Sequence, residues 1–208
     1  MCIRDRACIR LLDAGLDADR AGRLSDALAT IALQAQRGGD IIRQVRQFVK
    51  KDAPVKTAVD INELVQKVVA LIRPEAQRVG VQIHTQLASG LPHVWAQDIQ
   101  IQQVIINLAT NGIDAMADPS LTERCLTIAT AAGAPGQVDV EVRDTGAGVD
   151  EAMRTEIFKQ FVTTKSRGMG LGLSISKGIL DAHEGRIVLE ATGPTGTLFR
   201  FSLAAQGT

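Results

Sequence analysis

Glycines alternate with apolar residues near the end of the sequence, in the stretch GMGLGLSI that covers residues 168–175. Glycine loses more conformational freedom on folding than any other residue, so this spacing needs a reason. A helix-like stretch follows at once, and the N–H groups and dipole at a helix start attract anions such as phosphates. For a glycine cluster taken alone, a flexible surface loop is the alternative.

The residues just before these glycines also suit an anion. Thr163 and Thr164 offer hydroxyls, and Lys165 offers a cation, for contact with charged oxygens. The P-loop pattern, with a glycine four residues before Gly-Lys-Ser/Thr, is absent, and no predicted strand directly precedes the glycines as a dinucleotide fold requires. Both of these common phosphate-binding modes are therefore disfavoured.

A predicted helix over residues 99–116 carries an unusual polar stripe. At about 100° per residue, Asn107, Asn111 and Asp114 fall within an arc of about 60°, beside the apolar face of the helix. Asparagine is a poor residue for a helix interior, and a solvated face would be better served by lysine or glutamate. Oxygen ligands without histidine or thiolate suit Mg²⁺, which keeps water and phosphate oxygens as further ligands.

A third motif, RDTGAGVD at residues 143–150, places Asp144 at the end of a predicted strand. Gly146 and Gly148 leave room for a flat ligand, and the carboxylate can accept a hydrogen bond from an amino group such as that of adenine. The alternative for this motif alone is an ordinary Asp-Gly turn.

The elements that must position these residues follow Pro54. Asp60 is expected to cap a first helix, with Glu63 reaching back, and Asp98 to cap the second; a third runs over residues 173–183. Alternating stretches predict strands at 55–61, 81–87, 92–97, 125–131, 137–144, 186–192 and 197–203. The expected fold class is α+β: a two-layer sandwich with a mixed, mostly antiparallel sheet and three helices on one face.

Residues 1–53 are expected to form a separate helical hairpin with a short first arm. From Leu24 to Val49 apolar residues recur in alternating steps of four and three, the spacing of a helix–helix seam. We expect a homodimer through the helix of residues 20–50; packing onto the following domain is the alternative. Pro54 ends this helix, so residues 54–208 form the second domain.

Composition excludes several classes of protein. Lys+Arg and Asp+Glu are both 23, and aromatic residues make up 3% of the chain, so neither a basic surface nor stacking platforms for nucleic acid are expected. No apolar run is long enough to cross a bilayer. Three cysteines without metal-ligand spacing are typical of a reduced, cytoplasmic protein.

The motifs together resemble those of one family. In order and spacing, the stretches QQVIINLATNGIDAM, DTGAGV, IFKQFVTTK, GMGLGLSI and GTLFRFSL resemble the nucleotide-binding boxes of sensor histidine kinases. These kinases share an ATP-binding superfamily with type II topoisomerases, Hsp90 chaperones and mismatch-repair ATPases. The residues TTK and GMGLGLSI belong to the lid over the nucleotide in this family, and this short lid is most similar to that of kinases of the oxygen-sensing and nitrogen-regulatory type. The match covers about residues 55 to 204, and the helix before it resembles the second helix of the dimerisation domain.

The resemblance implies a role for each residue, with ATP and Mg²⁺ as cofactors. Asn111 would ligate Mg²⁺ and, with Lys165, serve catalysis, while Asp144 would bind the adenine amino group. Phe158 and Phe161 would anchor the lid. The full implied nucleotide site is Asn107, Asn111, Asp114, Asp144, Gly146, Gly148, Thr163, Thr164, Lys165, Gly168, Gly170, Leu171, Gly172 and Thr197.

One departure from the family concerns the phosphoacceptor. The family phosphorylates a histidine on the first dimerisation helix, but the three histidines here are His84, His93 and His183. The resemblance therefore implies γ-phosphoryl transfer from ATP to a histidine outside this chain, and a response regulator receiver domain as partner. The alternatives are a non-catalytic ATP-binding module that dimerises with intact kinases, and an ATPase of the topoisomerase or chaperone branch, which the short lid disfavours.

Overall fold

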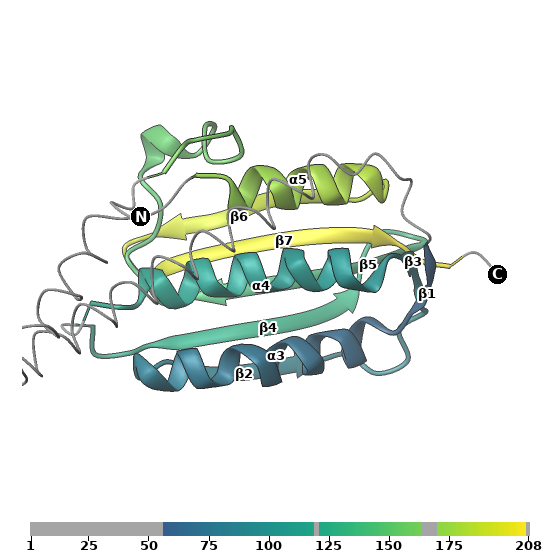
Figure 1. Ribbon diagram of the computed structural model, residues 1–208, viewed down its shortest axis with the longest axis horizontal. Helices are drawn as coiled ribbons and strands as arrows, with labels where there is room; N and C mark the ends of the chain where they lie inside the picture. The colour runs from purple at the N-terminus through teal and green to yellow at the C-terminus, as the bar shows by residue number, and fades with distance from the viewer. Residues whose placement is uncertain (1–55, 119–120, 164–169, 207–208) are drawn as a thin grey trace, which may run out of the picture. The chain divides into compact units, whose positions relative to one another are not determined.

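The computed structural model describes residues 56–118, 121–163 and 170–206. By its internal contacts the chain divides into two units, Met1–Ala53 and Pro54–Thr208. The predicted helical hairpin and its heptad helix lie outside the described residues. The description below concerns the second unit, with elements labelled as in Figure 1.

A five-stranded sheet forms one layer of this unit, with strand order β2-β4-β5-β7-β6 (Figure 1). The strands are β2 (Gln82–Leu87), β4 (Cys125–Ala132), β5 (Gln137–Asp144), β6 (Arg186–Gly193) and β7 (Gly196–Ala204). β2 pairs with β4 in parallel, and the other three pairings are antiparallel. The sheet is thus mixed and mostly antiparallel, which confirms the predicted fold class.

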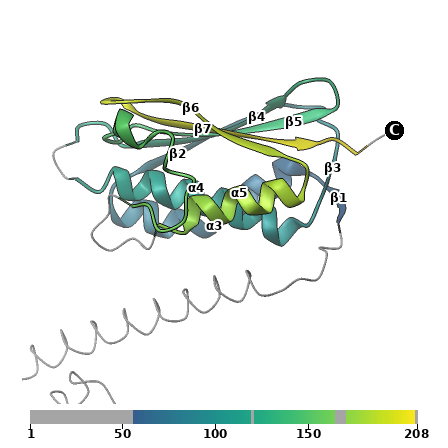
Figure 2. The same cartoon turned by 90° about the horizontal axis from the view of Figure 1, so that it is seen from above.

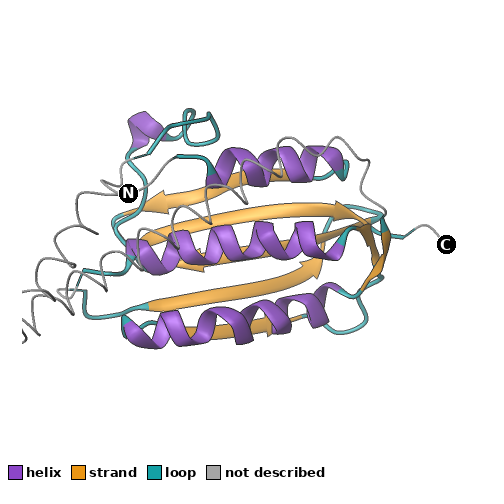
Figure 3. Ribbon diagram, viewed as in Figure 1, coloured by secondary structure: helices purple, strands orange, loops and turns teal. Residues whose placement is uncertain are grey.

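Three α-helices of the described residues form the second layer: α3 (Ile61–Arg78), α4 (Asp98–Ala115) and α5 (Gly172–Ala182). All three lie on the same face of the sheet, as Figure 2 shows from above and Figure 3 shows by type of element. Their apolar stripes bury against alternate residues of the strands, such as Val138, Val140 and Val142 of β5. Phe201 of β7 and Ile105 of α4 are fully buried in this core.

Two short strands lie outside the main sheet. β1 (Thr57–Val59) pairs antiparallel with β3 (Val94–Ala96) to form a two-stranded sheet. β3 thereby leads directly into α4, the helix that carries the asparagines.

The helix starts differ from expectation in detail. Asp60 caps α3 as predicted, because its Oδ1 accepts from the backbone N–H groups of Asn62 and Glu63 at 2.8 and 3.1 Å. The Glu63 side chain pairs with Lys67. α3 also continues past Pro74. The expectation for Asp98 was wrong by one position: it is the first residue of α4, and Gln97 occupies the cap.

Candidate functional site

Asp144 ends β5 in a buried position directly beside the start of β7. Its Oδ1 accepts from the backbone N–H of Gly146 at 2.9 Å and from that of Thr197 at 3.2 Å. Asp144 and Thr197 are cross-strand partners and are 6% and 5% exposed. Two backbone donors stabilise an ionised carboxylate and hold it in one orientation.

Glycines bring the surrounding backbone unusually close to this carboxylate. A Cβ at Gly112 of α4 would lie 3.1 Å from the Asp144 Cβ and 3.4 Å from its Oδ2. A Cβ at Gly196 would collide with the Asp144 carbonyl oxygen, and one at Gly146 would lie 2.8 Å from the Cβ of Ala115. The sequence therefore allows α4, the β5 end and the β7 start to meet around Asp144.

The loop after Asp144 turns back against the β6–β7 hairpin. Gly148 has φ +78°, and a Cβ there would collide with the carbonyl oxygen of Gly193. Val149 donates its N–H to the Thr192 hydroxyl at 2.6 Å. A residue with a side chain at position 148 would be both strained and blocked, so this glycine shapes the loop rather than merely loosening it.

The three residues of the polar stripe on α4 differ in exposure. Asn107 is buried, Asn111 is half-buried and Asp114 is exposed. Asn107 turns toward α5: its Nδ2 lies 3.3 Å from the carbonyl oxygen of Gly172, the first residue of that helix. The stripe thus connects the Asp144 end of the site to the start of α5.

The start of α5 has the properties of an anion site. Its cap residue, Leu171, forms no side-chain cap hydrogen bond, and its first turn contains no acidic residue. The helix is 11 residues long, and its first N–H groups have no intrahelical acceptor. A phosphate near this end would meet N–H donors and the positive end of the helix dipole.

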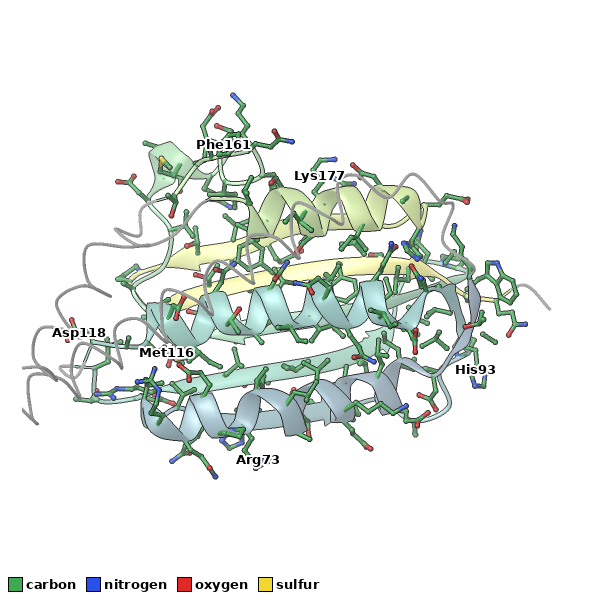
Figure 4. The ribbon with its side chains drawn as sticks, viewed as in Figure 1. Arg73, His93, Met116, Asp118, Phe161 and Lys177 are labelled. Carbon is green, nitrogen blue, oxygen red and sulfur yellow. The ribbon has the colours of Figure 1, made fainter. Side chains whose placement is uncertain are left out.

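A backbone hydrogen bond joins two described residues, Phe161 and Gly170, that flank residues 164–169 in the sequence. Phe161 donates its N–H to the Gly170 carbonyl oxygen at 3.0 Å, and both residues have positive φ, 65° and 66°. Phe158 packs edge-on against Phe199 of the sheet, with ring centroids 6.3 Å apart. The Phe161 ring is instead 73% exposed, and Figure 4 places it at the edge of the molecule beyond α5. The hydrogen bond that joins Phe161 to Gly170 is made by its backbone and not by its ring.

The structure thus brings together Asp144, Gly146, Thr197 and the C-terminal half of α4, and connects Asn107 to Gly172. Thr163 is the last residue of the described range 121–163, and it is exposed. Thr164, Lys165 and Gly168 lie outside the described residues.

Sequence reasoning missed two side chains at the α4–α5 contact. Gln103 donates to the Asn107 Oδ1 at 2.9 Å, and the buried Ser176 lies within 3.4 Å of the Asn107 Nδ2. The signal for Ser176 was present: it lies four residues after Gly172, on the face of the helix that begins at the glycines. A small polar residue on a buried helix face calls for a partner.

A magnesium ion fits this donor set only in part. Among the residues that the structure describes, no group of three or more His, Cys, Asp or Glu side chains is placed to hold a metal. These residues therefore do not fit a magnesium ion that takes all of its ligands from the protein. An ion that takes most of its oxygens from water and phosphates needs few protein ligands, and the Asn111 carboxamide fits that need.

Comparison with known proteins gives consistent results. Residues 96–207 match the family described as histidine kinase-, DNA gyrase B-, and HSP90-like ATPase. The sensor protein FixL of Bradyrhizobium diazoefficiens is 38% identical over 196 residues, which cover 94% of this chain and 38% of FixL. The sensor protein TdiS of Thauera aromatica is 34% identical over 88% of this chain and 34% of TdiS. The chain therefore spans little more than a third of the length of these relatives.

The fold matches solved structures as well. The structure of full-length ShkA in complex with AMPPNP superposes with a TM-score of 0.76 at 26% identity, over 96% of this chain and 42% of ShkA. The catalytic domain of histidine kinase ThkA, in a nucleotide-free form, gives a TM-score of 0.63 at 30% identity, over 72% of this chain and 95% of that domain.

Proposed function

This chain belongs to the family of histidine kinase-, DNA gyrase B- and HSP90-like ATPases, and we propose that it binds Mg-ATP as the catalytic portion of a two-component sensor histidine kinase. In that role it transfers the γ-phosphoryl group of ATP to a histidine outside this chain. The similarity to sensor proteins over nearly the whole chain supports the kinase branch over the other branches of the family.

Asp144 is the observation that carries the proposal. Its carboxylate is buried at the end of β5 and held by the N–H groups of Gly146 and Thr197. A buried acceptor of fixed orientation, bordered by Gly112 and Gly146, suits the exocyclic amino group of adenine. The Thr197 hydroxyl supports the same base.

The phosphates extend from this base toward the start of α5. The first N–H groups of α5 donate hydrogen bonds to phosphate oxygens, and Asn111 supplies a carboxamide oxygen to Mg²⁺. When bound, the ion neutralises charge on the transferring phosphoryl group. We assign Thr163, Thr164, Lys165, Gly168, Gly170, Leu171 and Gly172 to the lid that closes over the phosphates, and Asn107 and Asp114 to the flank of the site.

In this proposal the acceptor histidine lies outside this chain. The Nε2 of His183 accepts from the Gln97 N–H at 3.0 Å and its Nδ1 lies 2.8 Å from the Ile179 carbonyl oxygen, so both ring nitrogens are engaged. His84 lies on β2, separated from β5 by β4, and His93 immediately precedes β3. In the transfer, a bond forms between an acceptor imidazole nitrogen and the γ-phosphorus while the bond to the ADP oxygen breaks.

Dimerisation through residues 20–50 and transfer onward to a response regulator receiver domain complete the proposal. In the described residues no helix is long and apolar enough to span a membrane. We assign the chain to the cytoplasm, where ATP is available.

A complementation experiment tests this function. The 208-residue chain is mixed with a full-length homologous kinase whose own ATP site has been inactivated, and γ-labelled ATP is added. We expect acid-labile label on the homologue and none on the chain. Binding of ATP without any label on the homologue would support a non-catalytic ATP-binding module instead.

A further inference from the structure

Hydrogen bonds from a side chain of α4 reach two residues near the start of α5, Gly172 and Ser176. Gln103 donates to the Asn107 Oδ1 at 2.9 Å, and the Asn107 Nδ2 lies 3.4 Å from the Ser176 Oγ and 3.3 Å from the Gly172 carbonyl oxygen. The Ser176 hydroxyl in turn donates to that same carbonyl at 3.0 Å. These bonds form a continuous network from the middle of α4 to the residue at which α5 begins.

The donors and acceptors of this network are consistent with one another. A serine hydroxyl has one hydrogen to donate and lone pairs to accept, so Ser176 can accept from Asn107 while donating to Gly172. The Asn107 carboxamide uses its oxygen toward Gln103 and its NH₂ toward α5. Both ends of this carboxamide are thus engaged within the protein.

Ser176 is fully buried, and a hydroxyl there needs an explanation. A serine that bonds back to the carbonyl four residues earlier slightly destabilises its helix and often bends it. Ser174 makes a similar local bond, to the Leu171 carbonyl at 2.9 Å, and within the described part of the chain it makes no hydrogen bond to α4. The feature peculiar to Ser176 is its contact with Asn107, which links two helices.

We propose that Ser176, together with Gln103, is a positioning residue that fixes the start of α5 relative to the asparagine stripe of α4. The inference rests on the proposed function, in which phosphates lie between these two elements. Asn107 then acts chiefly by holding α5, and Asn111 remains the residue of the stripe that serves the ion. Asp144 binds the base from β5 and does not depend on this network.

Ser176→Ala in the full 208-residue chain tests the inference, because it removes the hydroxyl without adding volume. Removal of a buried hydrogen bond should raise the Kd of Mg-ATP by about three- to tenfold and leave the Kd of adenosine unchanged. Ser174→Ala is the comparison variant: it removes a hydroxyl from the same end of α5 but leaves the contact between Ser176 and Asn107 in place, so it should raise the Kd of Mg-ATP by less than Ser176→Ala does. Thermal melting of each variant verifies folding. Equal weakening of ATP and adenosine by Ser176→Ala, or an effect no larger than that of Ser174→Ala, would overturn the assignment.

Gln103→Leu provides a second, independent variant on a half-buried residue. Because both side chains act through Asn107, the double variant should weaken Mg-ATP by less than the product of the two single effects. Multiplicative effects would show that Gln103 and Ser176 act separately and would contradict the network.

The wild-type chain distinguishes the two possible failures. If it binds neither ATP nor adenosine, the proposed function fails and the inference with it. If it binds both and Ser176→Ala retains the wild-type ratio of their affinities, only the positioning role is wrong.

Discussion

At the scale of single residues, the proposed function makes the Asp144 carboxylate the group that selects the base of the nucleotide. The isosteric change Asp144→Asn keeps an oxygen that can accept from the Gly146 and Thr197 N–H groups. It also places an NH₂ group opposite the amino group of adenine. We expect a Kd for ATP that is about 10 to 100 times higher, since a hydrogen bond to a charged group is lost, with little change in melting temperature. Isothermal titration calorimetry measures the affinity; an unaltered Kd would remove Asp144 from the site.

Asn111 should act on the metal-dependent part of binding. Asn111→Ala removes the carboxamide oxygen from the half-buried centre of the stripe. Affinity for ATP should fall several-fold in the presence of Mg²⁺ and remain near the wild-type value in EDTA. Equal losses under both conditions would assign Asn111 a structural role.

Residue types in the sequence suggested the chemistry now proposed for the site. They did not predict which of these residues are buried or what each one contacts. Asn107 and Asn111 look equivalent in the helix pattern, yet Asn107 is buried against α5 and Asn111 is half-buried. Burial of one face depends on which helix packs there, and this long-range information is not contained in local spacing. Gln103 was missed for the same reason, whereas Ser176 did carry a local signal, since it is a small polar residue four positions after Gly172.

At the scale of elements, the base of the proposed lid is the backbone contact between Phe161 and Gly170, and this contact depends on Gly170. Its φ is +66°, and a Cβ there would lie 2.5 Å from the Val162 carbonyl oxygen. Gly170→Ala should weaken Mg-ATP binding about tenfold or more while adenosine binding persists, because the left-handed conformation and the clash both disfavour the closed base. Competition titrations with the two ligands measure this.

Gly178→Ala is the matched control for that change. Gly178 lies inside α5, and a Cβ there would meet nothing within 4 Å. The control should retain nucleotide affinity and gain up to about 1 kcal/mol of stability from helix propensity. If Gly170→Ala behaves in the same way, the lid base has no special backbone requirement.

His183 joins the end of α5 to β3–α4 and makes this contact sensitive to pH. Burial lowers its pKa below the usual 6.5, and its Nε2 accepts the Gln97 N–H only when the ring is neutral. The unfolded chain binds this proton more readily than the folded chain does. The stabilisation is therefore fully present above pH 6.5 and is lost as the pH falls below it, with a slope of at most about 1.4 kcal/mol per pH unit.

Urea unfolding of the wild-type chain and of His183→Gln, between pH 7.5 and 5, measures this effect. The wild type should lose more stability than the variant across this range. Parallel curves for the two proteins would mean that His183 does not contribute to the pH dependence.

The elements themselves were largely predictable because their signals are local. Alternation in QVDVEVRD predicted β5, and Asp60 predicted the start of α3. The pairing of β1 with β3 outside the main sheet, and the parallel pairing of β2 with β4, depend on topology and could not be read from periodicity.

At the scale of the whole molecule, the proposed nucleotide site lies on the sheet-and-helix scaffold of the second unit. The family assignment was predictable because five motifs occur in order. The spacing of the motifs follows from the order of α4, β5, α5 and β7 along the chain. The end of α4, the end of β5 and the start of β7 lie at the same end of the sandwich (Figure 1). Dimerisation, the acceptor histidine and the response regulator remain predictions, since they concern residues 1–55 or other chains.

Calorimetric titration of the 208-residue chain with ATP and with GTP, each with Mg²⁺, tests the central claim most directly. ATP should bind with a Kd in the micromolar-to-millimolar range, which is usual for enzyme substrates. GTP should bind at least about tenfold more weakly. Adenine presents an amino group that can donate a hydrogen bond to Asp144, whereas guanine presents a carbonyl oxygen at the same place. Equal affinities for the two nucleotides, or no binding of ATP, would contradict the account.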